Sequence, residues 1–268
     1  MSDHGDSLND GLDYNYNSSD DQIESLVHNQ ETSSSDPEGQ VEDHNHSKNH
    51  ETHNVGKKRK RKSDKLSQKK RQKMLLDMEQ KRNLAKEVPS VIAEKLAAKI
   101  RQRFPDLSPL ELGELYIGKS AIVDTQSFVL ERNLDNYKNY IQTQLKRVLQ
   151  DKGYILVVSI SAIRACDIFR AVKCLPIGSL KVISKNKLQD DLKVLKESKA
   201  RLLIGTPGRI SRILETENTP LTFKMIDAII CDSSFLDSKL QNIWDYDESF
   251  ALVRKVLSMN EKCKVYLY

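Results

Sequence analysis

The chain of 268 residues has no histidine beyond residue 53. All six histidines stand in the first part of the sequence, at His4, His28, His44, His46, His50 and His53. Catalysis by a Ser-His-Asp or Cys-His arrangement is therefore excluded from the remainder of the chain, as is a zinc site built from Cys and His. Because the histidines lie in an acidic, polar tract, we expect them to be solvated and predict no metal site.

Cysteine is scarce, and long apolar runs are absent. The four cysteines form no Cys-x-x-Cys pair, which predicts buried thiols in a reducing compartment. They are Cys166, Cys174, Cys231 and Cys263. No apolar run is long enough to cross a membrane, and the chain does not begin with a charged-then-apolar leader. We therefore expect a soluble, intracellular protein without a membrane partner.

Acidic residues dominate the start of the chain. Residues 1–56 contain thirteen Asp or Glu, one Lys, and no Phe or Trp. Such a tract cannot bury enough apolar surface to offset the entropy of ordering it, so we predict that residues 1–56 form an acidic disordered tail. Serines that directly precede acids, in residues 18–21 and 33–38, predict a phosphoprotein. The tail is interpreted either as a contact for basic partners or as a solubilising leader.

The sign of the charge then reverses. Between Lys57 and Lys73, eleven of seventeen residues are basic and only Asp64 opposes them. Mutual repulsion predicts a segment that is solvated or bound to an acidic partner. We interpret it as a signal for a nuclear import receptor that also holds RNA by counterion release. Its densest part consists of Lys57, Lys58, Arg59, Lys60, Arg61 and Lys62. Residues 57–88 are thus predicted to form a basic localisation and RNA-binding segment that becomes helical from Met74.

Apolar runs of strand length alternate with amphipathic segments in the second half of the chain. Five such runs separated by helices predict a parallel sheet covered by helices on both faces. The expected strands are 154–159, 180–184, 201–206, 226–232 and 263–268, and the expected helices are 133–150, 162–174, 187–198, 208–216 and 247–259. We predict one α/β domain over residues 89–268, in which ligands bind at the carboxyl ends of the strands.

The turn from Thr206 to Arg209 is the first candidate site. Thr206 is predicted to cap a helix, with Pro207 at its first position. The unpaired N–H groups of that helix start, the Thr206 hydroxyl and the Arg209 charge would converge on one anion, such as an RNA phosphate. An ordinary strand-to-helix turn of an α/β protein explains the same residues.

A second candidate spells the phosphate-loop pattern Gly-x-x-x-x-Gly-Lys-Ser. Its diagnostic positions are Gly113, Gly118, Lys119 and Ser120. A phosphate loop has to leave a buried strand and enter a helix. Here Ser108 and Pro109 predict a helix start just before the pattern, and extended structure is expected after it. We therefore interpret the match as coincidental and expect no nucleotide cofactor.

The Thr-Pro-Gly-Arg string resembles an RNA-contacting motif of the DEAD-box RNA helicases. Ser-Ala-Ile-Arg-Ala, which begins at Ser161, is similar to that family's Pro-Thr-Arg-Glu-Leu-Ala motif, and Asp232 stands where the family has Asp-Glu-Ala-Asp. The other three places of that tetrad hold Ser233, Ser234 and Phe235. The resemblance implies a single RecA-like lobe with a P-loop NTPase fold. It also implies RNA contacts by Ser161, Arg164, Thr206, Gly208 and Arg209.

These motifs with a lost acidic tetrad are similar, over residues 90 to 268, to the Cms-type proteins, a family built on a degenerate half helicase. The resemblance implies a non-enzymatic factor of the nucleus and nucleolus. It would bind pre-ribosomal RNA and small-subunit processome proteins during pre-rRNA processing. With Ser233 in place of a glutamate and no residues left for a second lobe, ATP hydrolysis is not expected. Two alternatives stay open: a nucleotide-binding or weak ATPase lobe that acts with a partner, and a protein-interaction scaffold without RNA contact.

Overall fold

The computed structural model describes residues 55–268, and over residues 55–65 it describes the backbone alone. The predicted acidic disordered tail therefore lies outside the described residues, except for its last two positions. The chain divides into two units at Lys58 and Arg59. Every strand of the described residues belongs to the second unit, Arg59–Tyr268.

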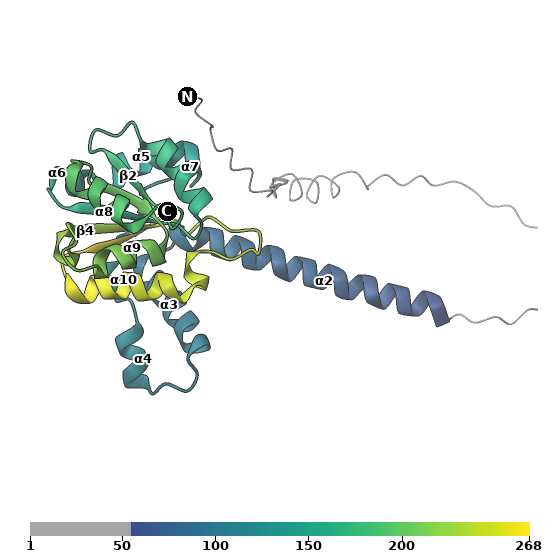
Figure 1. Cartoon of the computed structure of the whole chain (residues 1–268). Coiled ribbons are helices and arrows are strands. Elements are labelled where there is room, and N and C mark those ends of the chain that lie inside the picture. The colour runs from purple at the N-terminus through teal and green to yellow at the C-terminus, as the bar shows by residue number, and fades with distance from the viewer. Residues whose placement is uncertain (1–54) are drawn as a thin grey trace, which may run out of the picture. The chain divides into compact units, whose positions relative to one another are not determined.

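Five parallel strands form one sheet in the order β2-β3-β1-β4-β5 (Figure 1). They are β1 (Tyr154–Val158), β2 (Ser179–Val182), β3 (Leu202–Gly205), β4 (Ile226–Cys231) and β5 (Lys264–Leu267). The central strand β1 is buried from Ile155 to Val158, as expected for a parallel strand covered on both faces. The predicted fold class, a single α/β lobe with a parallel sheet covered by helices, is confirmed.

Side chains on the two faces of the sheet belong to two separate apolar cores. Leu156 and Val158 of β1 enter one core, and Ile155 and Val157 enter the other, because successive side chains of a strand point to opposite faces. The first core is covered by α3 (Pro89–Arg103), α8 (Leu188–Glu197), α9 (Pro207–Glu215) and α10 (Asp247–Met259). The second is covered by α5 (Leu134–Gln144), α6 (Lys146–Gln150) and α7 (Ala162–Val172).

The helix expected over residues 133–150 is divided into α5 and α6. Asn133 caps α5 by accepting a hydrogen bond from the N–H of Asn136 at 3.1 Å. The helix ends at Gln144, and the backbone of the next residue, Leu145, leaves the helical region at φ −105° and ψ 22°. Because Leu145 is fully buried in the second core, packing of its side chain accompanies the break.

Two of the four cysteines are buried as predicted. They are Cys231 and Cys263, and burial raises the pKa of both thiols, that of Cys263 to about 12. The prediction is wrong for Cys174, which is exposed just after α7, and Cys166 is half-buried. All four are free thiols.

The basic segment is helical from its start, contrary to the prediction of a helix only from Met74. Helix α2 spans Val55–Asn83 and includes positions 57–62. Side chains radiate outward from a helix, and Lys, Arg, Gln, Leu and Met are all good helix formers, so like charges do not prevent helix formation here. Within residues 55–268, neither this helix nor any other is both long and apolar enough to span a membrane.

The carboxyl end of α2 is held to the lobe by Asp245. Lys99 Nζ lies 2.5 Å from Oδ1 of Asp245, and Lys81 Nζ of α2 lies 3.2 Å from Oδ2. The backbone N–H of Asn242 donates to Oδ2 at 2.9 Å, and Arg103 donates to the Asp245 carbonyl oxygen at 2.8 Å. Burial alone would raise the pKa of Asp245. The hydrogen bonds from Lys99 and Asn242 and the charges of Lys99 and Lys81 outweigh burial and lower it.

We predict that Asp245→Asn lowers the free energy of unfolding by about 2 kcal/mol at pH 7, because hydrogen bonds to a charged group are lost. The folded pKa of Asp245 lies below its ordinary value of 3.8. Its contribution is therefore full above the unfolded pKa and is lost as the pH falls through the folded pKa. Urea unfolding at pH 7 and in progressively more acidic buffer should show the parent and the variant converging as the pH falls below 3.8.

Asp247→Asn is the matched control. Asp247 also pairs with a lobe arginine, Arg103, at 2.6 Å, but its side chain is 70% exposed. Exposed ion pairs contribute little, so this variant should unfold almost as the parent does. Equal losses in the two variants would contradict an anchoring role for Asp245.

Candidate functional site

Three neighbouring strands deliver predicted site residues to one edge of the sheet. β1 is followed by Ser161 and Arg164, β3 by Thr206, and β4 by Asp232. Since β3, β1 and β4 are adjacent and parallel, their carboxyl ends lie together. The structure thus brings these residues to a common edge, and their contacts decide what they can bind.

Asp232 and Arg164 form a buried ion pair at this edge. Arg164 Nε donates to Oδ2 of Asp232 at 2.9 Å, and Nη2 donates to Oδ1 at 3.3 Å. The Ser159 hydroxyl donates to Oδ2 at 3.0 Å, and the Arg164 guanidinium lies 4.5 Å from the centre of the Phe235 ring. Burial alone would lower the pKa of Arg164, but the Asp232 charge and hydrogen bond outweigh it and raise the pKa. Both Asp232 oxygens are therefore engaged inside the protein.

Ser161 and Arg164, which were predicted to contact RNA, both make contacts within the lobe. Ser161 is the N-cap of α7, and its hydroxyl oxygen accepts a hydrogen bond from the Arg164 N–H at 3.0 Å. The Arg164 side chain, 11% exposed, faces Asp232 rather than solvent. The Ser-Ala-Ile-Arg-Ala turn thus caps a helix and neutralises a buried carboxylate.

Arg209 is also turned inward, in contrast to the expected phosphate contact. Its side chain is 5% exposed, and Nε donates to the Ile183 carbonyl at 3.0 Å. Nη2 donates to the carbonyl of Ser184 at 3.3 Å and to that of Asn186. Nε also lies 3.3 Å from Oδ2 of Asp191. Arg209 therefore holds the loop between β2 and α8, and its guanidinium is not presented to an external anion.

The start of α9 agrees only in part with the prediction. Thr206 occupies the N-cap position and Pro207 the first helical position, but the Thr206 hydroxyl makes no capping hydrogen bond. A Cβ atom on Gly208 would lie 3.0 Å from Oε2 of Glu248, so the glycine leaves room for that carboxylate beside the first turn. A carboxylate near a helix N-terminus is favourable for the helix and opposes the approach of a phosphate.

Ser233, in the place where the helicase resemblance has a glutamate, supports the core. It is fully buried, and its hydroxyl donates to the Cys231 carbonyl at 3.2 Å. The same oxygen accepts the indole N–H of Trp244 at 2.9 Å. Nothing in the local sequence indicated this pairing with the single tryptophan. Over the residues that the structure describes, no three His, Cys, Asp or Glu side chains gather where they could hold a metal.

Arg132, which the sequence did not indicate as important, closes the edge beside β5. A short segment pairs with β5 through Ile122 and Val265, and Arg132 follows it. The buried guanidinium donates to the Leu267 carbonyl at 2.5 Å and to the Thr125 carbonyl at 3.1 Å. The rings of Phe128 and Tyr140 lie 5.8 and 5.3 Å from its central carbon. The carboxyl end of β5 is thus filled by side chains of the lobe.

The string from Gly113 to Ser120 does not form a phosphate loop. Gly113 lies inside α4 (Pro109–Leu115), which Ser108 begins through a reciprocal capping box with Glu111, as predicted. Gly118 is extended at φ −64° and ψ 143°, and Lys119 begins a turn of 3-10 helix over Lys119–Ala121. Because helix α4 runs into the string and only a 3-10 turn follows directly after Gly118, its N–H groups do not converge on a phosphate.

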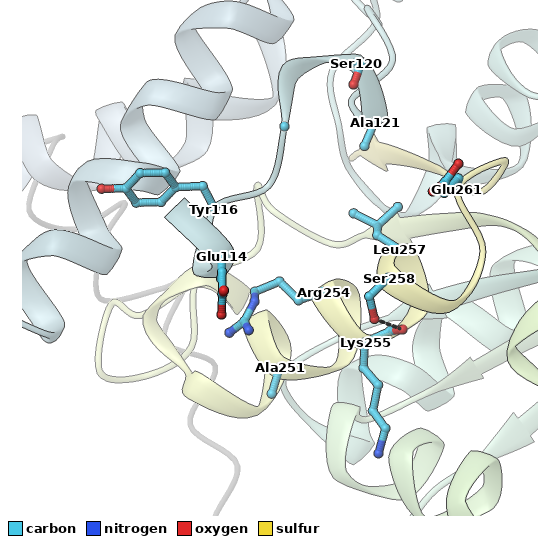
Figure 2. Close-up of a pocket in the computed structure, with 11 residues that line it drawn as sticks. Glu114, Tyr116, Ser120, Ala121, Ala251, Arg254, Lys255, Leu257, Ser258 and Glu261 are labelled. Carbon is cyan, nitrogen blue, oxygen red and sulfur yellow. Dashed lines mark hydrogen bonds between the residues drawn. The ribbon is translucent and has the colours of Figure 1, made fainter. Parts of the chain in front are cut away.

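Part of this string lines a cleft against α10 (Figure 2). The cleft has a volume of about 820 Å³, and Gly118 and Ser120 are among the residues that line it. Arg254 of α10 and Glu114 of α4 point toward one another across it. Lys119 is not among the lining residues. The cleft mixes acidic and basic side chains and does not have the uniform positive charge that suits an anion.

Comparison with known proteins identifies relatives along most of the chain. A family model described as a U3-containing 90S pre-ribosomal complex subunit, CMS1, matches residues 40–266. Protein CMS1 of Saccharomyces cerevisiae is 31% identical over 204 residues, which cover 70% of this chain and 68% of that protein. Protein CMS1 of Chaetomium thermophilum is 29% identical over 182 residues, covering 63% and 71%. Protein cms1 of Schizosaccharomyces pombe is 34% identical over 169 residues, covering 60% of each.

Solved structures show a more distant likeness. One is the DEAD-box helicase Mss116 bound to ssRNA and UDP-BeF, with 14% identity and a TM-score of 0.32, covering 65% of this chain and 38% of that one. Another is Mss116p bound to ssRNA and AMP-PNP, with 14% identity and a TM-score of 0.31, covering 49% and 27%. The chain therefore spans well under half of these helicase chains.

We predict that Arg164→Ala lowers the free energy of unfolding by about 3–5 kcal/mol, because it leaves Asp232 charged and unpaired in the interior. Urea unfolding monitored by Trp244 fluorescence measures the loss. The double variant Arg164→Ala/Asp232→Asn removes the stranded charge as well. It should be more stable than the sum of the two single losses implies. Strict additivity of the two substitutions would contradict a coupled ion pair.

Proposed function

Because the chain belongs to the family of U3-containing 90S pre-ribosomal complex subunits, we propose that it is a non-enzymatic RNA- and protein-binding factor in assembly of the small ribosomal subunit. Its place of action would be the nucleolus, within the nucleus. Its partners would be pre-ribosomal RNA and small-subunit processome proteins, with a nuclear import receptor engaging the basic segment. The family assignment supports the role in ribosome biogenesis, and the rest of the proposal comes from the residues.

The internal pairing of the carboxyl edge is the observation that carries the non-enzymatic part. Asp232 is neutralised by Arg164, and the Ser233 hydroxyl accepts a hydrogen bond from the indole N–H of Trp244. ATP hydrolysis needs a carboxylate for magnesium and a residue that positions water, and a serine hydroxyl is a poor base near neutral pH. Asp232, Arg164 and Ser233 therefore stabilise the lobe itself. We place the proposed RNA binding on charged residues elsewhere in the chain.

The basic segment is the main proposed RNA contact. Positions 57–62 lie in α2, whose later lysines and arginines at Lys69, Lys70, Arg71 and Lys73 are exposed. Because α2 contacts the lobe through the ion pair of Lys81 with Asp245, it can present these charges to phosphates without burying apolar surface. Of the five predicted lobe contacts, Thr206 is half-buried and its hydroxyl makes no capping hydrogen bond, so it is a candidate for a phosphate contact. Arg209 instead holds the loop between β2 and α8.

We predict that replacing the six basic residues from Lys57 to Lys62 by Ala weakens RNA binding and moves the protein from the nucleus to the cytoplasm. RNA crosslinking in cells and fluorescence microscopy of the tagged protein measure the two effects. The control variant changes Lys57, Lys58, Lys60 and Lys62 to Arg, which keeps the charge, so both properties should persist. Undiminished crosslinking of the alanine variant would contradict the RNA role and favour the scaffold alternative.

We predict no ATP turnover above background by the purified protein, and no effect of Lys119→Ala on any residual signal. The reason is that Lys119 lies in a short 3-10 turn without a phosphate loop around it. A coupled phosphate-release assay, with equilibrium nucleotide titration beside it, makes the measurement. Turnover abolished by Lys119→Ala would overturn the proposal. Tight nucleotide binding without turnover would favour the alternative of a nucleotide-binding lobe that acts with a partner.

A further inference from the structure

The edge of the sheet formed by β2 is surrounded by lysine. Residues 181–199 contain six lysines and three acids, Asp190, Asp191 and Glu197. Five of the lysines are exposed and Lys181 is half-buried. They are Lys181 in β2, Lys185 and Lys187 in the following loop, Lys193 and Lys196 in α8, and Lys199 after α8. We call this set the β2-edge lysines.

The geometry of α8 directs its lysines away from the rest of the lobe. Apolar residues of α8 and of β2 belong to the first core, so α8 covers the same face of the sheet as these residues of the edge strand. Asp191 marks the flank of α8 that faces α9, because it meets Arg209 there. At 100° per residue, Lys193 and Lys196 lie about 200° and 140° around the helix from Asp191. They therefore project on the outer flank, next to a strand that has no neighbour on that side of the sheet.

The β2-edge lysines are unpaired. Within the described residues, no hydrogen bond or ion pair involves the Nζ atom of any of the six. On other surfaces of the lobe lysines do find acids, as in Lys95 with Glu87 at 2.8 Å and Lys255 with Glu215 at 2.5 Å. Asp191, the most buried acid of the stretch, is engaged by Arg209 instead. Positive charge therefore accumulates uncompensated along one edge.

We propose that the β2-edge lysines bind the phosphate backbone of RNA as a second contact, separate from the basic segment in α2. This inference rests on the proposed function, in that it takes the protein to be an RNA-binding factor. Compact ammonium groups contact phosphates as point charges, and no exposed aromatic ring lies among them to stack on a base, so binding should be independent of base sequence. A protein partner would be expected to use an apolar centre, and Val194 is the only large apolar side chain exposed in the stretch.

Lysines on an edge strand also protect against edge-to-edge pairing of sheets. Lys193 and Lys196 lie in α8 and not in the edge strand, so changing them to glutamate leaves Lys181 of β2 in place while repelling phosphate. Lys193→Glu/Lys196→Glu is therefore the informative variant. Its matched control is Lys224→Glu/Lys262→Glu, which makes the same change in net charge. Lys224 and Lys262 are exposed. They lie before β4 and β5, at the amino ends of those strands and away from β2.

The experiment measures binding of the full chain to a fluorescein-labelled single-stranded RNA of mixed sequence by anisotropy, at a series of salt concentrations. Melting temperatures confirm that the variants are folded. The parent should bind, and Lys193→Glu/Lys196→Glu should bind about tenfold more weakly. The slope of log Kd against log salt should fall by about 1.4, the value for two lost phosphate contacts on a single strand. The control variant should keep the slope of the parent.

Each other outcome decides against the inference. Equal losses in both variants would mean that net charge acts at a distance, and unchanged binding by Lys193→Glu/Lys196→Glu would remove the β2 edge from the interface. In both cases RNA binding by the parent would leave the proposed function standing. If the parent bound polyglutamate and Lys193→Glu/Lys196→Glu did not, while RNA binding was the same in both, the partner of these lysines would be an acidic protein. A parent that binds no RNA would refute the proposed function and the second contact together.

Discussion

A carboxylate buried at the carboxyl ends of the central strands has to be neutralised, and several side chains at these strand ends are placed to do so. Asp232 is 1% exposed and follows β4 directly. An unpaired charge in such a place would be strongly destabilising, so Arg164 and Ser159 are held against it. Arg164 reaches it from α7, whose start is set by the Ser161 cap. The pair ties β1, β4 and α7 together.

The arginines and lysines discussed above differ in where their charged groups lie. Arg132, Arg164 and Arg209 are each largely buried, and each donates several hydrogen bonds to carbonyls or to a carboxylate. The planar guanidinium suits that task because its donors form a rigid fork. Lys193 and Lys196 of α8, like Lys69, Lys70 and Lys73 of α2, are exposed, and a hydrated ammonium group at the surface suits the proposed contact with phosphate. The charged groups at the carboxyl ends of β1 and β4 are therefore paired within the lobe, and the proposed RNA contacts lie at exposed lysines instead.

Helix α2 connects this charge distribution to the body of the protein. Its carboxyl end is fastened by Met78, which is buried, and by Lys81, which contacts both Asp245 and the Leu240 carbonyl. The next residues, Leu84 and Ala85, enter the first core. A basic segment continuous with an anchored helix binds with less loss of conformational freedom than a flexible tail of the same composition. This favours the proposed use of the basic segment as an RNA contact.

The sequence alone determined the sheet, the order of its elements and several caps, because each depends on a local pattern. Apolar runs of strand length, separated by amphipathic segments, predicted five strands. Ser108 and Asn133 were placed correctly at helix starts. Only the tertiary structure decided what the charged residues do. Arg209 meets carbonyls 23 to 26 residues away, and Arg164 meets a carboxylate 68 residues away. Such partners are set by how strands pack side by side. Periodicity predicts which face a residue occupies, whereas its partner on that face comes from another part of the chain.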